Sequence, residues 1–276
     1  MNSDFSVLIS VYNRENPDHL DLALKSIWDY QTIKPREIVL VKDGKLTPKL
    51  DNRIEEFAQN ICVKIVSLET NQGLGIALNE GLNHCSYDIV ARMDSDDIAK
   101  PNRFEKQMQF LKDYPEYDVV GSWIDEFVNE TTNIISNRIL PKTNDEIFCF
   151  AKKRNPLNHP SIMFKKSSVI KAGGYKHFPF FEDYDLWVRM LMQGCRFYNI
   201  QESLLYFRSS PDTFKRRGGW KYAKEDLRFQ KNLKHINFIN TFTYIENIII
   251  RFTVRILSDD IRSFIYRKFI RKSKWG

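Results

Sequence analysis

The stretch Ala91–Pro101, "ARMDSDDIAKP", places three carboxylates within four positions, those of Asp94, Asp96 and Asp97. It follows the apolar run "YDIVARM" (residues 87–93), which is too short for a helix and predicts a buried strand, and it precedes a helix-like pattern, "KPNRFEKQMQFL". Like charges this close repel one another unless a cation or hydrogen-bond donors lie among them. The turn therefore predicts a functional site at a strand end. The alternative is a solvated acidic turn that caps the following helix.

Upstream of this turn, strand-length apolar runs alternate with helical patterns. The runs are "FSVLISV" (5–11), "REIVLV" (36–41) and "VKIVSL" (63–68). Helical patterns lie between them, the first with a predicted N-cap at Asn16 and a helix-starting Pro17, the last beginning near Leu74. Such alternation implies right-handed crossovers. The predicted fold class is α/β, with a Rossmann-like, mainly parallel sheet flanked by helices and a C-terminal helical extension.

The second half of the chain is less regular. Strands are expected at 118–127 and 133–140, and two more at "RFYNI" (196–200) and "SLLYFR" (203–208). Helices are expected at 143–153 and in "FEDYDLWVRMLMQG" (181–194), where Gly194 is a stop signal.

Polar residues follow each of the first four predicted strands. Parallel sheets bind ligands beyond the carboxyl ends of their strands, so these residues are expected to meet at one rim. They are Tyr12 and Arg14 after the first strand, Asp43 after the second, Asn71 and Gly73 after the third, and Asp94 to Asp97 after the fourth. Oxygen ligands alone suit Mg²⁺ or Mn²⁺, which bridge to substrate phosphates.

A second acidic cluster, Glu182, Asp183 and Asp185, begins the helical pattern at residue 181. Acids are favoured in a first helical turn for electrostatic reasons alone, which is the simpler interpretation. The functional interpretation is a general base, which must stay ionised near neutral pH, as a helix N-terminus would keep Asp183. Aromatic neighbours such as Trp187 suit a sugar ring. His159, in "NPLNHPS", is either a structural histidine or part of an acceptor site.

Charge is distributed unevenly along the 276 residues. Hydrophobic residues make up 42% and charged residues 28%, which excludes a disordered chain. The net charge of +7 comes from the C-terminal part, because residues 1–214 carry −4 and residues 215–276 carry +11. Such asymmetry indicates an anionic partner for the C-terminal part. It contains three consecutive basic residues, Lys215, Arg216 and Arg217. One interpretation is a loop that closes over a diphosphate, and the other is a run of charged side chains in solvent.

The C-terminal part also has an amphipathic pattern. In residues 236–257, apolar side chains form one helical stripe, with Arg251 and Arg255 away from it; the stripe comprises Ile245, Ile248, Ile249, Phe252 and Ile256. A second basic helix is expected after Ser258. Cationic amphipathic helices lie in the membrane interface, so we expect a peripheral anchor. The alternative is that these helices pack on the sheet-bearing domain or pair in a homodimer.

The N-terminus lacks the features of a signal peptide, and no apolar stretch approaches the roughly 20 residues of a membrane span. We therefore expect a cytoplasmic protein, peripheral on the inner face of the cell membrane. The four cysteines are scattered and predict neither a zinc site nor a disulfide framework.

Seven motifs, in order and spacing, resemble the family 2 glycosyltransferases of the GT-A fold over about residues 4–210. They are "SVLISVYNRE", "EIVLVKDG", "NQGLGIALNEGL", "ARMDSDD", "NHPSIMFKKS", "GGY" and "FEDYDLWVRM". The segment "LLYFRSSPDTFKRRGGWKY" further resembles the branch that builds bacterial O-antigen, capsule and exopolysaccharide repeat units. The resemblance implies an inverting enzyme that forms a β-linkage from a UDP-sugar, with Mn²⁺ or Mg²⁺, on a saccharide acceptor linked to undecaprenyl diphosphate.

The resemblance also implies roles for particular residues. Asp183 resembles the catalytic base, and Asp94 and Asp96 the metal ligands. Glu182 would help bind acceptor or sugar, beside Trp187 and His159, which the residue pattern alone proposes for that role. The expected nucleotide contacts are Val11, Tyr12, Arg14, Asp43, Asn71, Gly73, Arg92, Asp94 and Ser95. Residues 1–98 would form the nucleotide-sugar half of the domain, residues 99–214 the acceptor half, and residues 215–276 a basic helical tail.

One departure concerns Ser210, which stands where many family members carry a metal-binding histidine. Two other classes of protein remain open. A nucleotidyltransferase shares the sheet and acidic site but usually has a glycine-rich loop after the first strand, and "SVYNRENPD" has none. A nucleic-acid-binding protein fits the pI of 9.1, but the sheet-bearing part is net acidic, so no nucleic-acid partner is expected. A processive membrane synthase is excluded by the lack of spans and of a QxxRW motif.

Overall fold

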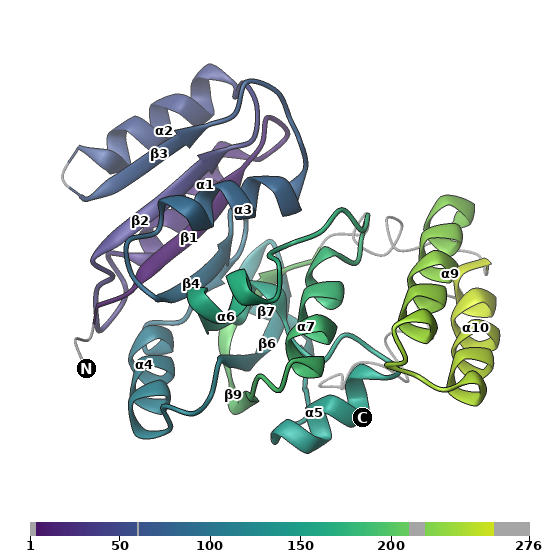
Figure 1. Cartoon of the computed structure of the whole chain (residues 1–276). Coiled ribbons are helices and arrows are strands. Elements are labelled where there is room, and N and C mark those ends of the chain that lie inside the picture. The colour runs from purple at the N-terminus through teal and green to yellow at the C-terminus, as the bar shows by residue number, and fades with distance from the viewer. Residues whose placement is uncertain (1–3, 60, 210–218, 257–276) are drawn as a thin grey trace.

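The computed structural model describes residues 4–59, 61–209 and 219–256, the residues after Arg251 by their backbone alone. It is a mixed α/β fold around one nine-stranded sheet with the order β3-β2-β1-β4-β8-β6-β9-β5, in which β7 pairs with β6 (Figure 1). The sheet runs through both predicted halves of the domain. The predicted fold class is confirmed, and the boundaries of the halves stay a prediction.

The N-terminal half holds the parallel part of the sheet. β1 (Ser6–Val11) pairs with β2 (Glu37–Lys42) and β4 (Ile89–Asp94), and β2 pairs with β3 (Val63–Ser67), all in parallel. The crossovers are α1 (Pro17–Ile27), α2 (Pro48–Ala58) and α3 (Leu74–His84). The predicted cap is confirmed, since the Asp18 amide donates to Oδ1 of Asn16 over 2.8 Å.

The other half of the sheet is mixed rather than parallel. β6 (Val119–Val128) is parallel to β9 (Phe197–Arg208) but antiparallel to β8 (Met163–Lys165) and to β7 (Glu130–Arg138). β8 is also antiparallel to β4, and the short β5 (Ile98–Ala99) is antiparallel to β9.

Two strands expected at 196–200 and 203–208 form the single strand β9. Its pairing with β6 shifts between Ile200 and Ser203, so Gln201 and Glu202 bulge out of the ladder. In the sequence, this polar pair indicates the end of one strand and the start of another. In the structure, both residues belong to one strand whose pairing is irregular at this point.

Helices cover both faces of the sheet. Alternate residues of β1 enter different cores, Leu8 on one face and Val7 and Ile9 on the other. The face of Leu8 is covered by α3, α5 (Asn144–Ala151), α6 (Lys166–Lys171) and α7 (Glu182–Met192), and the opposite face by α1, α2 and α4 (Arg103–Asp113). A 3-10 turn, η1 (His159–Ser161), precedes β8.

The C-terminal helices α9 (Gly219–His235) and α10 (Thr241–Ile256) lie side by side at the edge of the molecule, beyond α7 (Figure 1). Phe229 of α9 stacks on Phe181 with ring centroids 4.8 Å apart, so this pair of helices, the C-terminal hairpin, packs on the catalytic domain. Within the described part of the chain, no helix has the length and apolar character needed to cross a membrane.

Candidate active site

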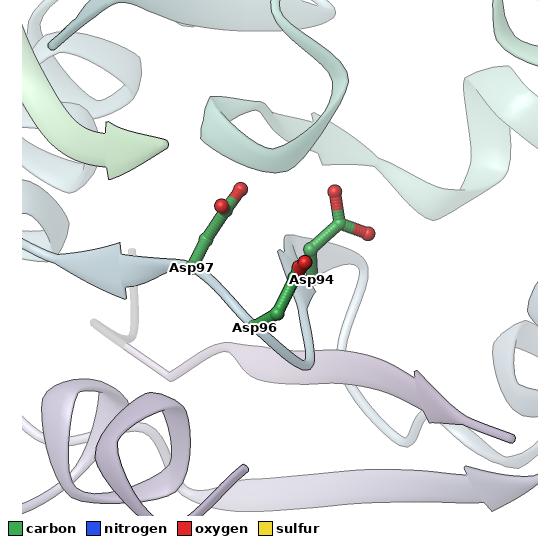
Figure 2. A group of neighbouring side chains, drawn as sticks. All are labelled: Asp94, Asp96 and Asp97. Atoms are coloured by element: carbon green, nitrogen blue, oxygen red, sulfur yellow. The ribbon is translucent and has the colours of Figure 1, made fainter. Parts of the chain in front are cut away.

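The acidic turn joins the end of β4 to β5. Asp94, Asp96 and Asp97 each offer a carboxylate oxygen within 4.8 Å of the other two. Figure 2 shows the three side chains rising from this one short turn toward the same side. The turn therefore gathers the carboxylates that the sequence singled out, and it includes Asp97, which was expected in the acidic cluster but not as a metal ligand.

Arg92 supplies the positive charge that this cluster needs. It is 1% exposed, and its guanidinium forms an ion pair with Asp94. Its Nε and Nη1 groups are buried and have no hydrogen-bond partner among the described residues, so they act on the cluster through their charge alone. The expected contact of Arg92 with a nucleotide stays a prediction; in this structure its side chain is buried against Asp94.

Two residues that the motif analysis did not single out also hold the turn. The Arg208 amide donates to Oδ1 of Asp97, and Nε of Arg208 donates to the Asp96 carbonyl, each over 2.8 Å. The Ser95 hydroxyl donates to Oε2 of Glu15 over 2.7 Å. The end of β9 and the loop after β1 thus fix the turn from two sides, which only the tertiary fold reveals.

The carboxylates of the turn fit a divalent cation. Burial, followed by the repulsion of neighbouring aspartates, raises the pKa of Asp96 to about 7 and that of Asp97 well above its usual value. Oδ2 of Asp97 is buried without a hydrogen-bond partner in the described structure. Oxygen ligands of this kind are those that Mg²⁺ and Mn²⁺ prefer, and a cation would relieve the repulsion.

Asp43, at the end of β2, connects the loop after β2 to the loop after β3 by hydrogen bonds. Its carboxylate accepts hydrogen bonds from the amides of Gln72 (2.7 Å) and Gly73 (3.1 Å) and from Nδ2 of Asn71 (3.0 Å). Gly44 follows in the left-handed region, with φ of +85°, and a Cβ there would lie 2.6 Å from the Asn71 nitrogen. The rim predicted after β2 and β3 is thus one connected unit.

The other predicted rim residues follow β1. Tyr12 and Arg14 are exposed beyond the strand end, where a ligand can reach them. Val11 is fully buried, and its carbonyl accepts the amide of Asp43 over 2.8 Å. Its side chain therefore belongs to the core.

The second acidic cluster begins α7. Asp183 accepts a hydrogen bond from Nδ2 of Asn155 over 2.6 Å and from the amide of Tyr184 over 2.8 Å. Burial raises the pKa of Asp183 above its usual value, and these hydrogen bonds oppose the rise. Burial also raises the pKa of Glu182 to about 7. Glu182 lines a recess with about 370 Å³ of empty space, opposite Gln72 and Gly75 at the start of α3.

His159 and Tyr175 lie between the two acidic clusters. Nε2 of His159 is 2.9 Å from the Tyr175 hydroxyl, and the negative charges of both Asp183 and Asp94 raise the pKa of that hydroxyl, after burial as the main cause. Burial, then the charge of Arg92, lowers the pKa of His159 well below its usual value, so the imidazole is neutral at pH 7. Charges from both acidic clusters therefore act on the Tyr175 hydroxyl.

Trp187 does not fit the role expected of it. It is fully buried, and its ring packs edge to face on Phe197 with centroids 6.0 Å apart. In this structure the ring has a packing role, and sugar binding by Trp187 stays a prediction. Residues Lys215, Arg216 and Arg217, the expected diphosphate contacts, lie outside the described residues, as do Ser210 and the helix expected after Ser258.

Comparison with known proteins identifies the kind of enzyme. The chain is 40% identical over 268 residues to a UDP-Gal:alpha-D-GlcNAc-diphosphoundecaprenol beta-1,3-galactosyltransferase of Escherichia coli, with 97% of each chain covered. It is 39% identical over 267 residues to the amylovoran biosynthesis glycosyltransferase AmsE of Erwinia amylovora, with 96% of this chain and 98% of that one covered.

Solved structures share the fold at low sequence identity. S. aureus TarS 1–349 in complex with UDP-GlcNAc matches with a TM-score of 0.67 and 15% identity, over 95% of this chain and 75% of that one. A mannosyltransferase from Pyrobaculum calidifontis in complex with GDP-Man and Mn²⁺ matches with a TM-score of 0.58 and 16% identity, over 94% and 71%. The family model for glycosyl transferase family 2 matches residues 6–177. This match and the relatives that align along nearly the whole chain show that the protein belongs to glycosyl transferase family 2.

Proposed function

We propose that this glycosyltransferase moves a single sugar, galactose in the first instance, from a UDP-sugar to a saccharide carried on a lipid diphosphate, and forms a β-linkage. The observation that carries the proposal is the 40% identity to the E. coli UDP-Gal enzyme along 97% of both chains. AmsE, named for amylovoran biosynthesis, supports a place in the synthesis of a bacterial surface polysaccharide. The nucleotidyltransferase and nucleic-acid-binding alternatives have no such support.

In this proposal the rim binds the UDP part of the donor. Tyr12 and Arg14 are exposed at the end of β1, and Asp43 orders the loop of Asn71 and Gly73 beside them. Asp94, Asp96 and Asp97 would hold Mn²⁺ or Mg²⁺. When bound there, the cation neutralises charge that grows on the leaving diphosphate.

Asp183 would be the catalytic base. The acceptor oxygen forms a bond to the anomeric carbon while the bond from that carbon to the diphosphate oxygen breaks, and UDP leaves with the electron pair. The proton of the acceptor hydroxyl passes to the Asp183 carboxylate. A pKa raised by burial makes Asp183 a stronger base than an ordinary aspartate, while its two hydrogen bonds favour the ionised form. Attack opposite the leaving group inverts the configuration.

We also propose that the hairpin attaches the enzyme to an anionic membrane surface. α10 exposes apolar side chains, with Phe242 77% and Ile245 51% exposed, and residues 215–276 carry a net charge of +11. Basic residues near an anionic leaflet contribute roughly 1 kcal/mol each. A lipid-linked acceptor would then lie within reach of the active site.

The test is a transfer assay with a panel of donors. UDP-Gal, UDP-Glc, UDP-GalNAc and UDP-GlcNAc are each offered with a synthetic GlcNAc-α-diphosphate-lipid, with and without Mn²⁺. We expect one UDP-sugar to give a disaccharide on the lipid, and methyl-α-GlcNAc without the diphosphate to be a poorer acceptor. Product with no donor of the panel, or equal transfer without any divalent cation, would overturn the donor or the metal part of the proposal respectively.

A further inference from the structure

We propose that Asn155 is a positioning residue that aims the Asp183 carboxylate and favours its ionised form. The inference rests on the proposed function, because it takes Asp183 as the base. Asn155 lies in the loop after α5, 28 positions from Asp183, and its Nδ2 donates to Oδ2 of Asp183 over 2.6 Å. Oδ1 of the same carboxylate accepts the Tyr184 amide over 2.8 Å. The carboxylate is thus held at both oxygens.

The orientation of the Asn155 amide is fixed by a second contact. The Leu157 amide donates to Oδ1 of Asn155 over 3.3 Å. Because a backbone N–H can only donate, it selects the oxygen of the side-chain amide, and the NH₂ group must then face Asp183. Asn155 therefore presents a donor to the base and cannot compete with it for a proton.

The loop of Asn155 is itself anchored from three sides. Nη2 of Arg138, on β7, donates to the Asn155 carbonyl over 3.1 Å. The Tyr184 hydroxyl donates to the Ala151 carbonyl over 2.6 Å, which joins α7 to the end of α5. From the C-terminal hairpin, Nδ2 of Asn247 donates to the Lys152 carbonyl over 2.8 Å. A loop held in this way gives Asn155 a defined position.

The charged and titratable groups around Asp183 come from several elements. Arg138 of β7 and Arg92 of β4 favour the carboxylate, while the adjacent Glu182 of α7 disfavours a second negative charge. The hydroxyls of Tyr175 and Tyr184 remain protonated, since burial raises the pKa of both. Beside these groups, Asn155 donates a side-chain hydrogen bond directly to the carboxylate, so the loss of this donor should raise the pKa of Asp183.

The sharpest test is Asn155→Asp. Aspartate keeps an oxygen for the Leu157 amide, so the loop retains its turn, but it replaces the donor that faces Asp183 with a second negative charge. A like charge raises a carboxyl pKa, and losing a hydrogen bond to the ionised form does the same. In a plot of kcat against pH, activity falls on the acid side as the base becomes protonated. In Asn155→Asp this acid limb should move to higher pH by roughly 1–3 units. The KM for the UDP-sugar and the Kd for UDP should stay within about twofold of the unchanged protein, because Asn155 does not line the nucleotide rim.

A matched control is Asn144→Asp at the start of α5. Oδ1 of Asn144 accepts the Phe197 amide over 2.9 Å, so this variant also keeps a backbone contact and adds the same charge, but it does not touch Asp183. Its acid limb should stay in place. Asn155→Leu, which removes the donor without adding charge, should move the limb in the same direction as Asn155→Asp but less far.

The outcomes separate this inference from the proposed function. If Asp183→Asn is inactive while the acid limb of Asn155→Asp coincides with that of Asn144→Asp, Asn155 has only a structural role and this inference fails alone. If Asp183→Asn retains normal turnover, Asp183 is not the base and the mechanism fails first. An unchanged limb with a raised KM would assign Asn155 to substrate binding instead.

Discussion

At the scale of single residues, the active site depends on where buried charge is compensated. Asp94 is neutralised by the buried Arg92, whereas Asp97 keeps an oxygen without a hydrogen-bond partner in the described structure. Asp183 has two donors, and the neighbouring Glu182 has a pKa raised to about 7 by burial. The site thus combines an ion-paired carboxylate, a carboxylate with an oxygen open to a cation, and a carboxylate held by two hydrogen-bond donors, which suits it both to bind a cation and to accept a proton.

Glu182→Gln gives a prediction about pH at this scale. Like charges raise each other's pKa, so removing the carboxylate next to Asp183 should lower the pKa of Asp183. Since the ionised base is the active form, the acid limb of kcat should shift to lower pH, opposite in direction to the shift of Asn155→Asp. The measurement is kcat from pH 5 to 9 at saturating donor. Near-complete loss of turnover in Glu182→Gln, with turnover retained in Asp183→Asn, would show that Glu182, not Asp183, accepts the proton.

The sequence predicted the residue types of the site better than their individual roles. Asp94, Asp96 and Asp183 could be found because strand ends and helix starts place short acidic motifs predictably. Asn155 and Arg208 could not be found in this way, since each acts through a contact with a residue at least 28 positions away. The burial of Trp187 could not be predicted either, because its neighbours in the sequence lie near the site while its own ring packs in the core.

At the scale of elements, the loop after β2 approaches the loop after β3 closely at Gly44. A Cβ at this position would lie 2.6 Å from the Asn71 nitrogen, and φ is +85°. Gly44→Ala should therefore displace the Asn71 loop and weaken UDP binding at least about tenfold, besides the roughly 1–3 kcal/mol of strain in such a backbone conformation. The measurement is calorimetric titration with UDP and Mn²⁺.

Gly194→Ala is the control for Gly44→Ala. Its φ is +82°, but nothing lies within 4 Å of the added methyl group. It should lose similar stability from backbone strain and keep normal UDP affinity. Equal UDP affinity in both alanine variants would contradict the close approach of the two loops.

The hairpin gives a second prediction at this scale. Nδ2 of Asn247 is shared between Oε1 of Gln230 and the Lys152 carbonyl, each at 2.8 Å, in a buried position. Asn247→Leu would leave both acceptors unpaired, at about 1–3 kcal/mol each. At roughly 2–4 °C per kcal/mol for a chain of 150–250 residues, Tm should fall by several degrees.

The exposed Thr241, at the start of the same helix, provides the comparison. Thr241→Leu should leave Tm within about 1 °C, as expected of surface substitutions. If Asn247→Leu melts at the same temperature as Thr241→Leu, the contact of Asn247 with the Lys152 carbonyl does not stabilise the hairpin.

At the scale of the whole molecule, the hairpin has two faces with different partners. Its inner face packs on the catalytic domain, as one of the sequence-based alternatives expected, and α10 keeps apolar side chains exposed on the outside. We expect the full-length protein to sediment with vesicles containing anionic lipid at low salt, and less at high salt, because screening weakens the basic contribution. Phe242→Glu combined with Ile245→Glu should reduce binding at least about tenfold, since each substitution removes apolar burial worth roughly 1.5–3 kcal/mol.

Ile170→Glu on α6 is the control for membrane binding, because Ile170 is 52% exposed and lies outside the hairpin. It should bind vesicles normally. Point substitutions are preferable to truncation near residue 236, which would also remove the Asn247 contacts. Full-length protein that stays in the supernatant at low salt would refute the membrane part of the proposal.

The parallel half of the sheet could be predicted because each strand and helix there has its own local period and caps. The mixed half could not, since β5 has two residues and the bulge in β9 is stabilised by its pairing with β6 rather than by local sequence. The hairpin was predicted as amphipathic, but the assignment of its faces needed the structure: Arg251 pairs with Asp226 of α9 rather than facing a lipid surface.

The central claim is tested most directly by comparing the unchanged enzyme with Asp183→Asn in transfer from UDP-Gal to a GlcNAc-α-diphosphate-lipid, with the anomeric configuration of the product read by NMR. The account predicts a β-linked product from the unchanged enzyme. For Asp183→Asn it predicts a rate lower by about 100- to 10,000-fold with UDP affinity intact, because a general base acts on the acceptor and not on the nucleotide. An α-linked product, or near-normal turnover by Asp183→Asn, would contradict it.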